Sequence, residues 1–219
     1  MSQPQALFIF PCNRNAIEAL DCLGPMHELI AFIDDSPQKQ GTYVHGYPVL
    51  NRAVLEEYPD AQLLAVPGSP ASFRWRKQII GSLKVGGDRY TNAIHATARV
   101  SELARIGHNV LIMAGAVVTS NAVIGNHVCI LPNTVIHHDA VIEAWSLIGS
   151  NVTIAGNTWI GQNCYIGSGS SVKNGVSIGD GVMVGMASNV TRDVLPGATV
   201  AGNPARSFGM TRALRQEAD

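Results

Sequence analysis

The chain has 219 residues, of which 46% are hydrophobic and 14% are charged, and its formal net charge is −1. Because acidic and basic residues are interspersed, the composition argues against nucleic acid as a partner and against a charged tail. No stretch approaches the roughly 18 consecutive apolar residues of a membrane span, and the N-terminus lacks the pattern of a secretory signal. Four cysteines without a CxxC pair indicate a reduced, cytoplasmic protein.

Roughly the first 90 residues alternate between apolar runs and helical patterns. The predicted strands are residues 6–10, 29–33 and 63–66, and the predicted helices are residues 16–23, 51–58 and 71–83, the last of them basic and amphipathic. This alternation is typical of a small parallel sheet covered by helices. We therefore predict a Rossmann-like α/β domain over residues 1–88.

Polar residues follow each predicted strand of this domain. They are Pro11–Asn15, Asp34 with Asp35, and Pro67–Ser69. Ligands of parallel sheets bind beyond the carboxyl ends of the strands, so these segments form a candidate site. Ordinary turns would have a similar composition, and the residues alone leave both readings open.

Between Ile94 and Val190, every sixth residue is isoleucine or valine, seventeen times in succession. The slot four residues after each of these anchors holds only Ala, Val, Thr, Ser or Cys, Cys164 among them. A period of six fits neither a helix face nor a single alternating strand. It predicts short strands joined by corners, three to a coil of eighteen residues, with coils stacked into parallel sheets. An antiparallel sandwich would drift out of this register.

The corner residues support the same fold. The slot three after each anchor is mostly Asn, Asp or Gly, which accept left-handed backbone geometry at low cost. The residues concerned are Asn109, Gly115, Asn121, Asn133, Asp139, Asn151, Asn157, Asn163, Gly169, Gly175, Gly181 and Asp193. The β-helix domain is predicted over residues 94–206, after a linker at 86–93, with a C-terminal loop that closes the open sheet end.

The whole chain resembles one branch of the hexapeptide-repeat acyltransferases. The hexads, the Gly-Asn-Pro-Ala sequence at 202–205, and the segments Phe32–Asp35 and Ile136–Asp139 carry the resemblance. The branch comprises sugar O- and N-acetyltransferases, such as sialic acid O-acetyltransferases and UDP-amino-sugar N-acetyltransferases. The resemblance implies a left-handed β-helix, although crossovers are usually right-handed. It also implies a homotrimer with acetyl-CoA in clefts between adjacent β-helices.

Acetyl transfer requires a base that takes a proton from the attacking amine or hydroxyl. His138 and Asp139 are adjacent at a predicted corner, and a carboxylate beside an imidazole orients it and raises its basicity. By resemblance, His138 is the general base and Asp139 its supporting acid. Gly156 lies eighteen residues beyond His138, one coil away, where its N–H suits a developing oxyanion.

The resemblance also implies contacts for both substrates. The acetyl-CoA positions are Leu147, Gly156, Ser168, Met186, Gly202 and Pro204, and the sugar or nucleotide-sugar positions are Asn13, Arg14, Asn15, Asp34, Asp35 and Gly68. Two departures stand out: Leu147 replaces a histidine common in the family, and the turn at 11–16 lacks the family's glycines. Two interpretations stay open: Arg14 and the amides of Asn13 and Asn15 replace the glycines as phosphate donors, or the nucleotide site has decayed.

These residues predict an acetyl-CoA-dependent N-acetyltransferase acting on a nucleotide-linked amino sugar in surface glycan biosynthesis. O-acetylation of a saccharide hydroxyl is the close alternative, which the glycine-poor turn favours. A metal enzyme on the same fold would need several converging histidines, and only His108 and His127 are spaced to be neighbours on adjacent coils. No metal site is therefore predicted, and a purely structural β-helix remains the other alternative.

Overall fold

The computed structural model describes residues 4–208 of the chain. Its N-terminal part contains one five-stranded sheet in the order β3-β4-β2-β1-β5, in which only β3 runs antiparallel to its neighbour. The strands are β1 (Gln5–Phe10), β2 (His27–Ile33), β3 (Tyr43–Val44), β4 (Tyr47–Leu50) and β5 (Gln62–Ala65). All three predicted strands are confirmed, and the β3–β4 hairpin is an addition to them.

The helices of this part are shorter than the sequence pattern predicts. They are α1 (Arg14–Glu18), α2 (Val54–Glu57), α3 (Arg76–Gly81) and the 3-10 turns η1 (Ala19–Cys22), η2 (Phe73–Trp75) and η3 (Gly87–Arg89). The side chain of Asn51 accepts a hydrogen bond from the Ala53 N–H, so the chain completes a tight turn before α2 begins. None of the helices within residues 4–208 has the length and apolarity to cross a membrane.

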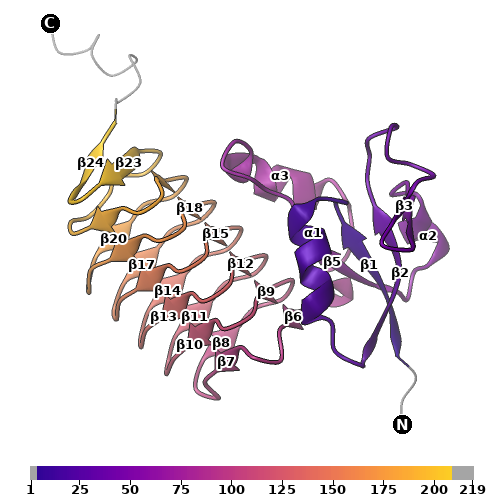
Figure 1. Ribbon diagram of the computed structural model, residues 1–219, viewed down its shortest axis with the longest axis horizontal. Coiled ribbons are helices and arrows are strands. Elements are labelled where there is room, and N and C mark those ends of the chain that lie inside the picture. Colours follow the sequence, from indigo (N-terminus) through magenta and orange to yellow (C-terminus); the bar gives the residue numbers. More distant parts are fainter. Residues whose placement is uncertain (1–3, 209–219) are drawn as a thin grey trace, which may run out of the picture.

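Residues 93–207 wind into a three-sided left-handed β-helix whose strands, apart from those of the final hairpin, are each two residues long (Figure 1). The first face contains β7 (Arg99–Val100), β10 (Val117–Val118), β13 (Val135–Ile136), β16 (Thr153–Ile154), β19 (Ser171–Val172) and β22 (Asn189–Val190). The second contains β8 (Arg105–Ile106), β11 (Val123–Ile124), β14 (Val141–Ile142), β17 (Trp159–Ile160) and β20 (Ser177–Ile178). The third contains β6 (Ala93–Ile94), β9 (Leu111–Ile112), β12 (Cys129–Ile130), β15 (Leu147–Ile148), β18 (Tyr165–Ile166) and β21 (Met183–Val184), and the hairpin of β23 (Thr199–Gly202) and β24 (Ala205–Ser207) extends it.

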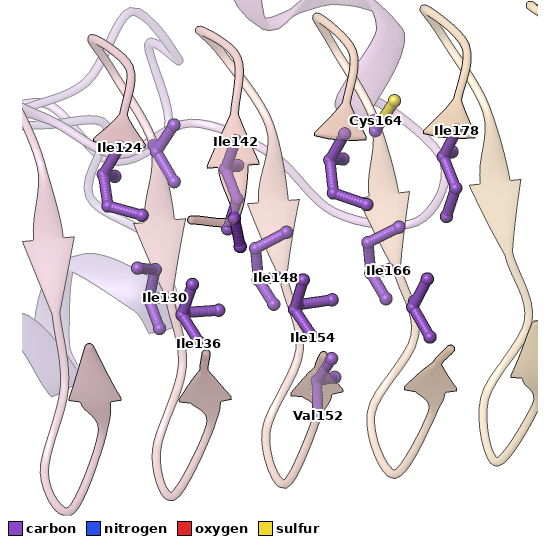
Figure 2. Packing of buried hydrophobic residues seen from close by; sticks show 14 of the residues in the cluster. Ile124, Ile130, Ile136, Ile142, Ile148, Val152, Ile154, Cys164, Ile166 and Ile178 are labelled. Atoms are coloured by element: carbon purple, nitrogen blue, oxygen red, sulfur yellow. The ribbon is translucent and has the colours of Figure 1, made fainter. Parts of the chain in front are cut away.

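From β6 to β22, every strand pairs in parallel with the strand eighteen residues away, and β23 follows at a shorter spacing after β21. Ile136, for example, pairs with Val118 on one side and Ile154 on the other, so the aliphatic anchors fall in columns. Figure 2 shows these side chains filling the interior of the column, and Cys164 is buried among them as predicted. The parallel register excludes the antiparallel sandwich.

The corners adopt the left-handed geometry that the composition predicts. All the corner residues named above have positive φ except Asp193, whose side chain instead accepts from the Ser177 N–H across a shortened last coil. His127 also has positive φ, and so do Trp145 and Ala187, whose residue types do not favour it. Stacking against the neighbouring coils therefore imposes this geometry even where the side chain does not favour it.

The N-terminal part packs against the third face of the β-helix. Leu111, Cys129, Leu147 and Tyr165 point outward from this face into a core shared with the N-terminal sheet, which includes Ile9. Beside this core, the Asn109 side chain accepts from the N–H of Ala65 and donates to its carbonyl group. The end of β5 is thus hydrogen-bonded to the β-helix as if to another strand.

His127 lies in this contact and is held neutral. Its Nδ1 accepts a hydrogen bond from Asn109 at 2.9 Å, and its ring packs against Tyr90, His108 and Trp145. Burial, with smaller contributions from His108 and Arg76, lowers the pKa of His127 to about 4. Trp145 lies in the same contact, stacked on His127 and with the ammonium group of Lys77 over its ring.

We expect the free energy of unfolding to fall as the pH decreases from about 6.5 to about 4, since the unfolded chain binds a proton on residue 127 that the folded chain excludes. Above pH 6.5 this contribution is constant. His127→Asn, which keeps a residue suited to positive φ, should flatten the decline in urea unfolding curves measured across this range. The exposed His45 provides the control: His45→Asn should leave the slope unchanged, and an equal effect of both variants would contradict the assignment.

Candidate functional site

His138 and Asp139 lie at the vertex where the first face meets the second, in the corner between β13 and β14. The Nδ1 of His138 is 2.8 Å from Oδ2 of Asp139, and the two side chains are 52% and 44% exposed. In the neutral tautomer with a proton on Nδ1, His138 donates to the carboxylate and leaves the lone pair of Nε2 free. The pair is accessible and arranged to accept a proton.

Asn121 extends this pair into a chain of three side chains, which the sequence analysis did not anticipate. Its Nδ2 donates to the other carboxylate oxygen of Asp139 at 3.1 Å. Hydrogen bonds from His138 and, secondarily, from Asn121 lower the pKa of Asp139 below its usual value. Asn121 precedes Asp139 by eighteen residues, so the coil length is the signal that would have identified it.

Gly156 lies one coil above His138, as predicted, and the imidazole rests against it. A Cβ added to Gly156 would lie 2.6 Å from both Cε1 and Nε2 of His138, closer than such atoms approach. Only glycine leaves the ring in this position. The Gly156 N–H has no acceptor among residues 4–208, which leaves it available to a ligand oxygen.

Four of the expected cofactor positions gather at another vertex, where the third face meets the first. Ser168 and Met186 stack there on successive coils, and Ser168 accepts from the Ser150 N–H. Gly202 and Pro204 form the tip of the β23–β24 hairpin, where Gly202 donates to the hydroxyl of Ser188. Within one chain these residues and His138 therefore lie along opposite edges of the first face.

The predicted substrate residues of the N-terminal part line a cavity of about 740 Å³ between the strand ends and the third face. They are Asn13, Arg14, Asn15, Asp34, Asp35 and Gly68. The side-chain amide of Asn13 reaches the Val66 carbonyl group, and that of Asn15 reaches the Gly68 carbonyl group. These bonds join the turn after β1 to the loop after β5, so the two strand ends converge as expected. The cavity is called the acceptor pocket below.

Each carboxylate in the acceptor pocket already has a cationic partner. Asp34 accepts from Lys39 at 2.8 Å, and Asp35 accepts two hydrogen bonds from Arg52. Burial by itself would raise the pKa of Asp34, but hydrogen bonds from Lys39 and Ser36 outweigh it and hold the pKa below its usual value. Lys39 also lines the pocket and donates to the Cys12 carbonyl group. No sequence pattern predicts this contact.

Leu147 lies apart from the other expected cofactor positions. It is buried on the third face and lines the acceptor pocket with Leu131 and Tyr165. The β-helix therefore contributes an apolar wall to this pocket, opposite the polar residues of the strand ends. The predicted contact between Leu147 and acetyl-CoA stays a prediction.

The residues that the structure describes contain no group of three His, Cys, Asp or Glu side chains placed to hold a metal ion. His108 and His127 are neighbours, with ring centroids 4.9 Å apart, but the Nδ1 of His127 is occupied by Asn109.

Comparison with known proteins agrees with this geometry. A family model described as the GMPPB C-terminal domain matches residues 90–197. No curated protein sequence matches the chain.

Several solved structures match over nearly the whole chain. Perosamine N-acetyltransferase from Caulobacter crescentus, a histidine-to-asparagine variant with CoA and GDP-perosamine, is 25% identical with a TM-score of 0.83, covering 95% of this chain and 99% of that one. The acetyltransferase domain of PglB from Neisseria gonorrhoeae, with acetyl coenzyme A, is 27% identical with a TM-score of 0.81, covering 94% and 100%. Over nearly its whole length, the chain is thus similar to acetyl-CoA-dependent sugar acetyltransferases. WeeI from Acinetobacter baumannii, at 24% identity and a TM-score of 0.79 over 93% and 99%, has the same fold.

Gly156→Ala tests the contact at the vertex. Its methyl group should push the His138 ring out of place, and a misplacement of about 1 Å is expected to lower kcat about 10²-fold. Initial rates of CoA release and a crystal structure of the variant measure the two effects. Gly24→Ala, where an added Cβ meets nothing within 4 Å, is the control and should retain full activity. An undiminished rate in Gly156→Ala would show that this ring position is not the productive one.

Proposed function

We propose that the protein transfers the acetyl group of acetyl-CoA to the amino group of a nucleotide-linked amino sugar, in surface glycan biosynthesis. The observation that carries this proposal is the Asn121–Asp139–His138 chain beside Gly156, because it supplies a base and an unpaired N–H in one place. The Caulobacter relative was solved with CoA and GDP-perosamine, which supports a nucleotide-sugar acceptor. The acceptor pocket, with Arg14 at its rim, has room for one.

The side chains divide the chemistry between them. His138 takes a proton through Nε2 from the acceptor amine as that amine attacks the thioester carbonyl carbon. Asp139 keeps the other proton on Nδ1 and stabilises the imidazolium that forms, and Asn121 fixes the carboxylate. The Gly156 N–H faces the carbonyl oxygen as it gains negative charge. When the tetrahedral intermediate collapses, the C–S bond breaks, the amide remains, and His138 returns its proton to the departing thiolate.

We further propose that the active site is completed in a homotrimer. The acceptor pocket lies on the third face, whereas His138 lies at the one vertex that this face does not border. An acceptor held in the pocket therefore reaches the His138 of a neighbouring protomer rather than its own. Partly exposed aliphatic and aromatic side chains flank the vertex on both faces, among them Val117, Val135 and Trp159, and suit such an interface.

His138→Ala should lower kcat with an amino-sugar acceptor by about 10²- to 10⁴-fold, the usual contribution of a general base. CoA release is measured with UDP-, GDP- and dTDP-linked amino sugars and with free sialic acid. Transfer to a nucleotide-linked amine by the wild-type protein is the expected result. Transfer only to a sugar hydroxyl would replace the proposal with O-acetylation, and a fully active His138→Ala would remove the assigned base.

Mixing two inactive variants tests the shared site. Ser69→Trp places a bulky side chain in the acceptor pocket, and His138→Ala removes the base, so each homotrimer should be inactive. Trimers reassembled from both should recover part of the wild-type rate, because some pockets then face an intact His138. If pocket and base act within one protomer, mixed trimers show no recovery, because every protomer carries one of the two lesions.

A further inference from the structure

Arg76 is a buried cation directly behind the acceptor pocket. The sequence pattern placed it on a basic amphipathic helix, but the structure buries it completely, at 0% exposure, between α3 and the β-helix. Its guanidinium donates to the carbonyl groups of Pro67, His127 and Trp145, and also contacts Cys129 Sγ. An arginine side chain keeps its charge even in such surroundings.

No carboxylate neutralises this charge. The ion pairs among residues 4–208 are Lys39–Asp34, Arg52–Asp35 and His138–Asp139, none of which includes Arg76. Carbonyl groups satisfy its N–H donors but carry no net charge, and a buried charge without a counter-ion is unfavourable. Arg14 is exposed and lines the pocket, and it also has no acidic partner in the described structure, since both pocket carboxylates are engaged.

The guanidinium is separated from the pocket by a single residue. Gly68 lines the pocket, and a Cβ added to it would lie 3.1 Å from both Cδ and Nη1 of Arg76 and 3.2 Å from Leu147. Its φ of +131° is open to glycine and strained for other residues. The N–H groups of Gly68 and Ser69 have no acceptor in the described structure. A ligand at this loop thus meets unpaired donors with a positive charge immediately behind them.

We propose that the loop Pro67–Pro70, backed by Arg76 and faced by Arg14 across the pocket, binds a phosphate or diphosphate group of the acceptor. The bound anion supplies the counter-charge that Arg76 lacks within the protein. This site rests on the proposed function and refines it, because it makes the acceptor's negative charge a requirement for tight binding. It also explains how the pocket binds phosphate although the turn after β1 lacks glycines. The positive charge of Arg76 lies behind the loop that follows β5, the strand next to β1.

The test measures anion binding and acceptor choice in the same variants. Inorganic diphosphate is titrated calorimetrically and as a competitive inhibitor against the acceptor. kcat/KM is compared between the nucleotide-linked amino sugar and the methyl glycoside of the same amino sugar. Arg76→Gln should weaken diphosphate binding about tenfold, as expected for loss of a charge several ångströms away, and reduce the preference for the nucleotide-linked acceptor by a similar factor. Arg76→Lys, which retains the charge, should stay within about threefold of wild type on both measures.

Arg74→Gln is the matched control. Arg74 is in the same segment and likewise donates to carbonyl groups, those of Gly181 and Gly197, but it does not line the pocket. This variant should leave diphosphate binding and acceptor preference unchanged. An equal loss of kcat/KM for the charged acceptor and the neutral glycoside in Arg76→Gln, with unaltered diphosphate binding, would make Arg76 a packing residue only and overturn the anion site.

If Arg76→Gln does not fold, the wild-type protein decides the question. It should bind a nucleoside diphosphate at least about tenfold more tightly than the uncharged nucleoside, and equal affinities would overturn the proposal. The calorimetric measurement needs no turnover. A wild-type protein that binds diphosphate but acetylates no nucleotide sugar would refute the proposed function while leaving the anion site intact.

Discussion

The structure depends on one constraint: in the regular coils of the β-helix, each strand residue stands in parallel register with the residue eighteen positions away, and backbone hydrogen bonds hold the two coils together. This register places equal slots of successive coils in columns, so a buried anchor continues as a column of buried anchors. The same columns build the functional features. Asn121 reaches Asp139, His138 rests on Gly156, and Asn109 reaches His127, each from an adjacent coil. A slip of one residue would therefore disperse the site along with the core.

The contact between the N-terminal part and the β-helix makes the three faces of the column unequal. Only the third face carries large outward side chains that are fully covered, and only its vertex with the second face presents Trp145 and His127 to α3. Hydrogen bonds from the side chains of Asn109 and Arg76 then hold the last residue of β5, and the loop that follows it, against the coils. Because the pocket is built across this contact, its shape depends on both parts being held rigidly together.

The sequence predicts most of the fold, since hydrophobic anchors and corner residues report directly on the local backbone. It also places His138 against Gly156, because the coil length is visible as a repeat. Other features leave no such signal. The positive φ of Trp145 and Ala187 follows from stacking rather than from residue type, and the burial of Arg76 follows from carbonyl groups on three distant segments. A helical pattern rich in basic residues predicts that those residues face solvent. Tertiary contacts bury Arg76 instead, and the sequence pattern does not show them.

The separation of the pocket from the vertex has a consequence for specificity. In the proposed reaction, the side chains that bind the acceptor belong to the strand ends and the third face, whereas the side chains that move the proton belong to the opposite vertex. No hydrogen bond in the described structure links the two sets. Leu147 and the glycine-poor turn after β1 both line the pocket, away from Asp139 and the imidazole. Under the proposed function, both departures from the family pattern therefore bear on the choice of acceptor.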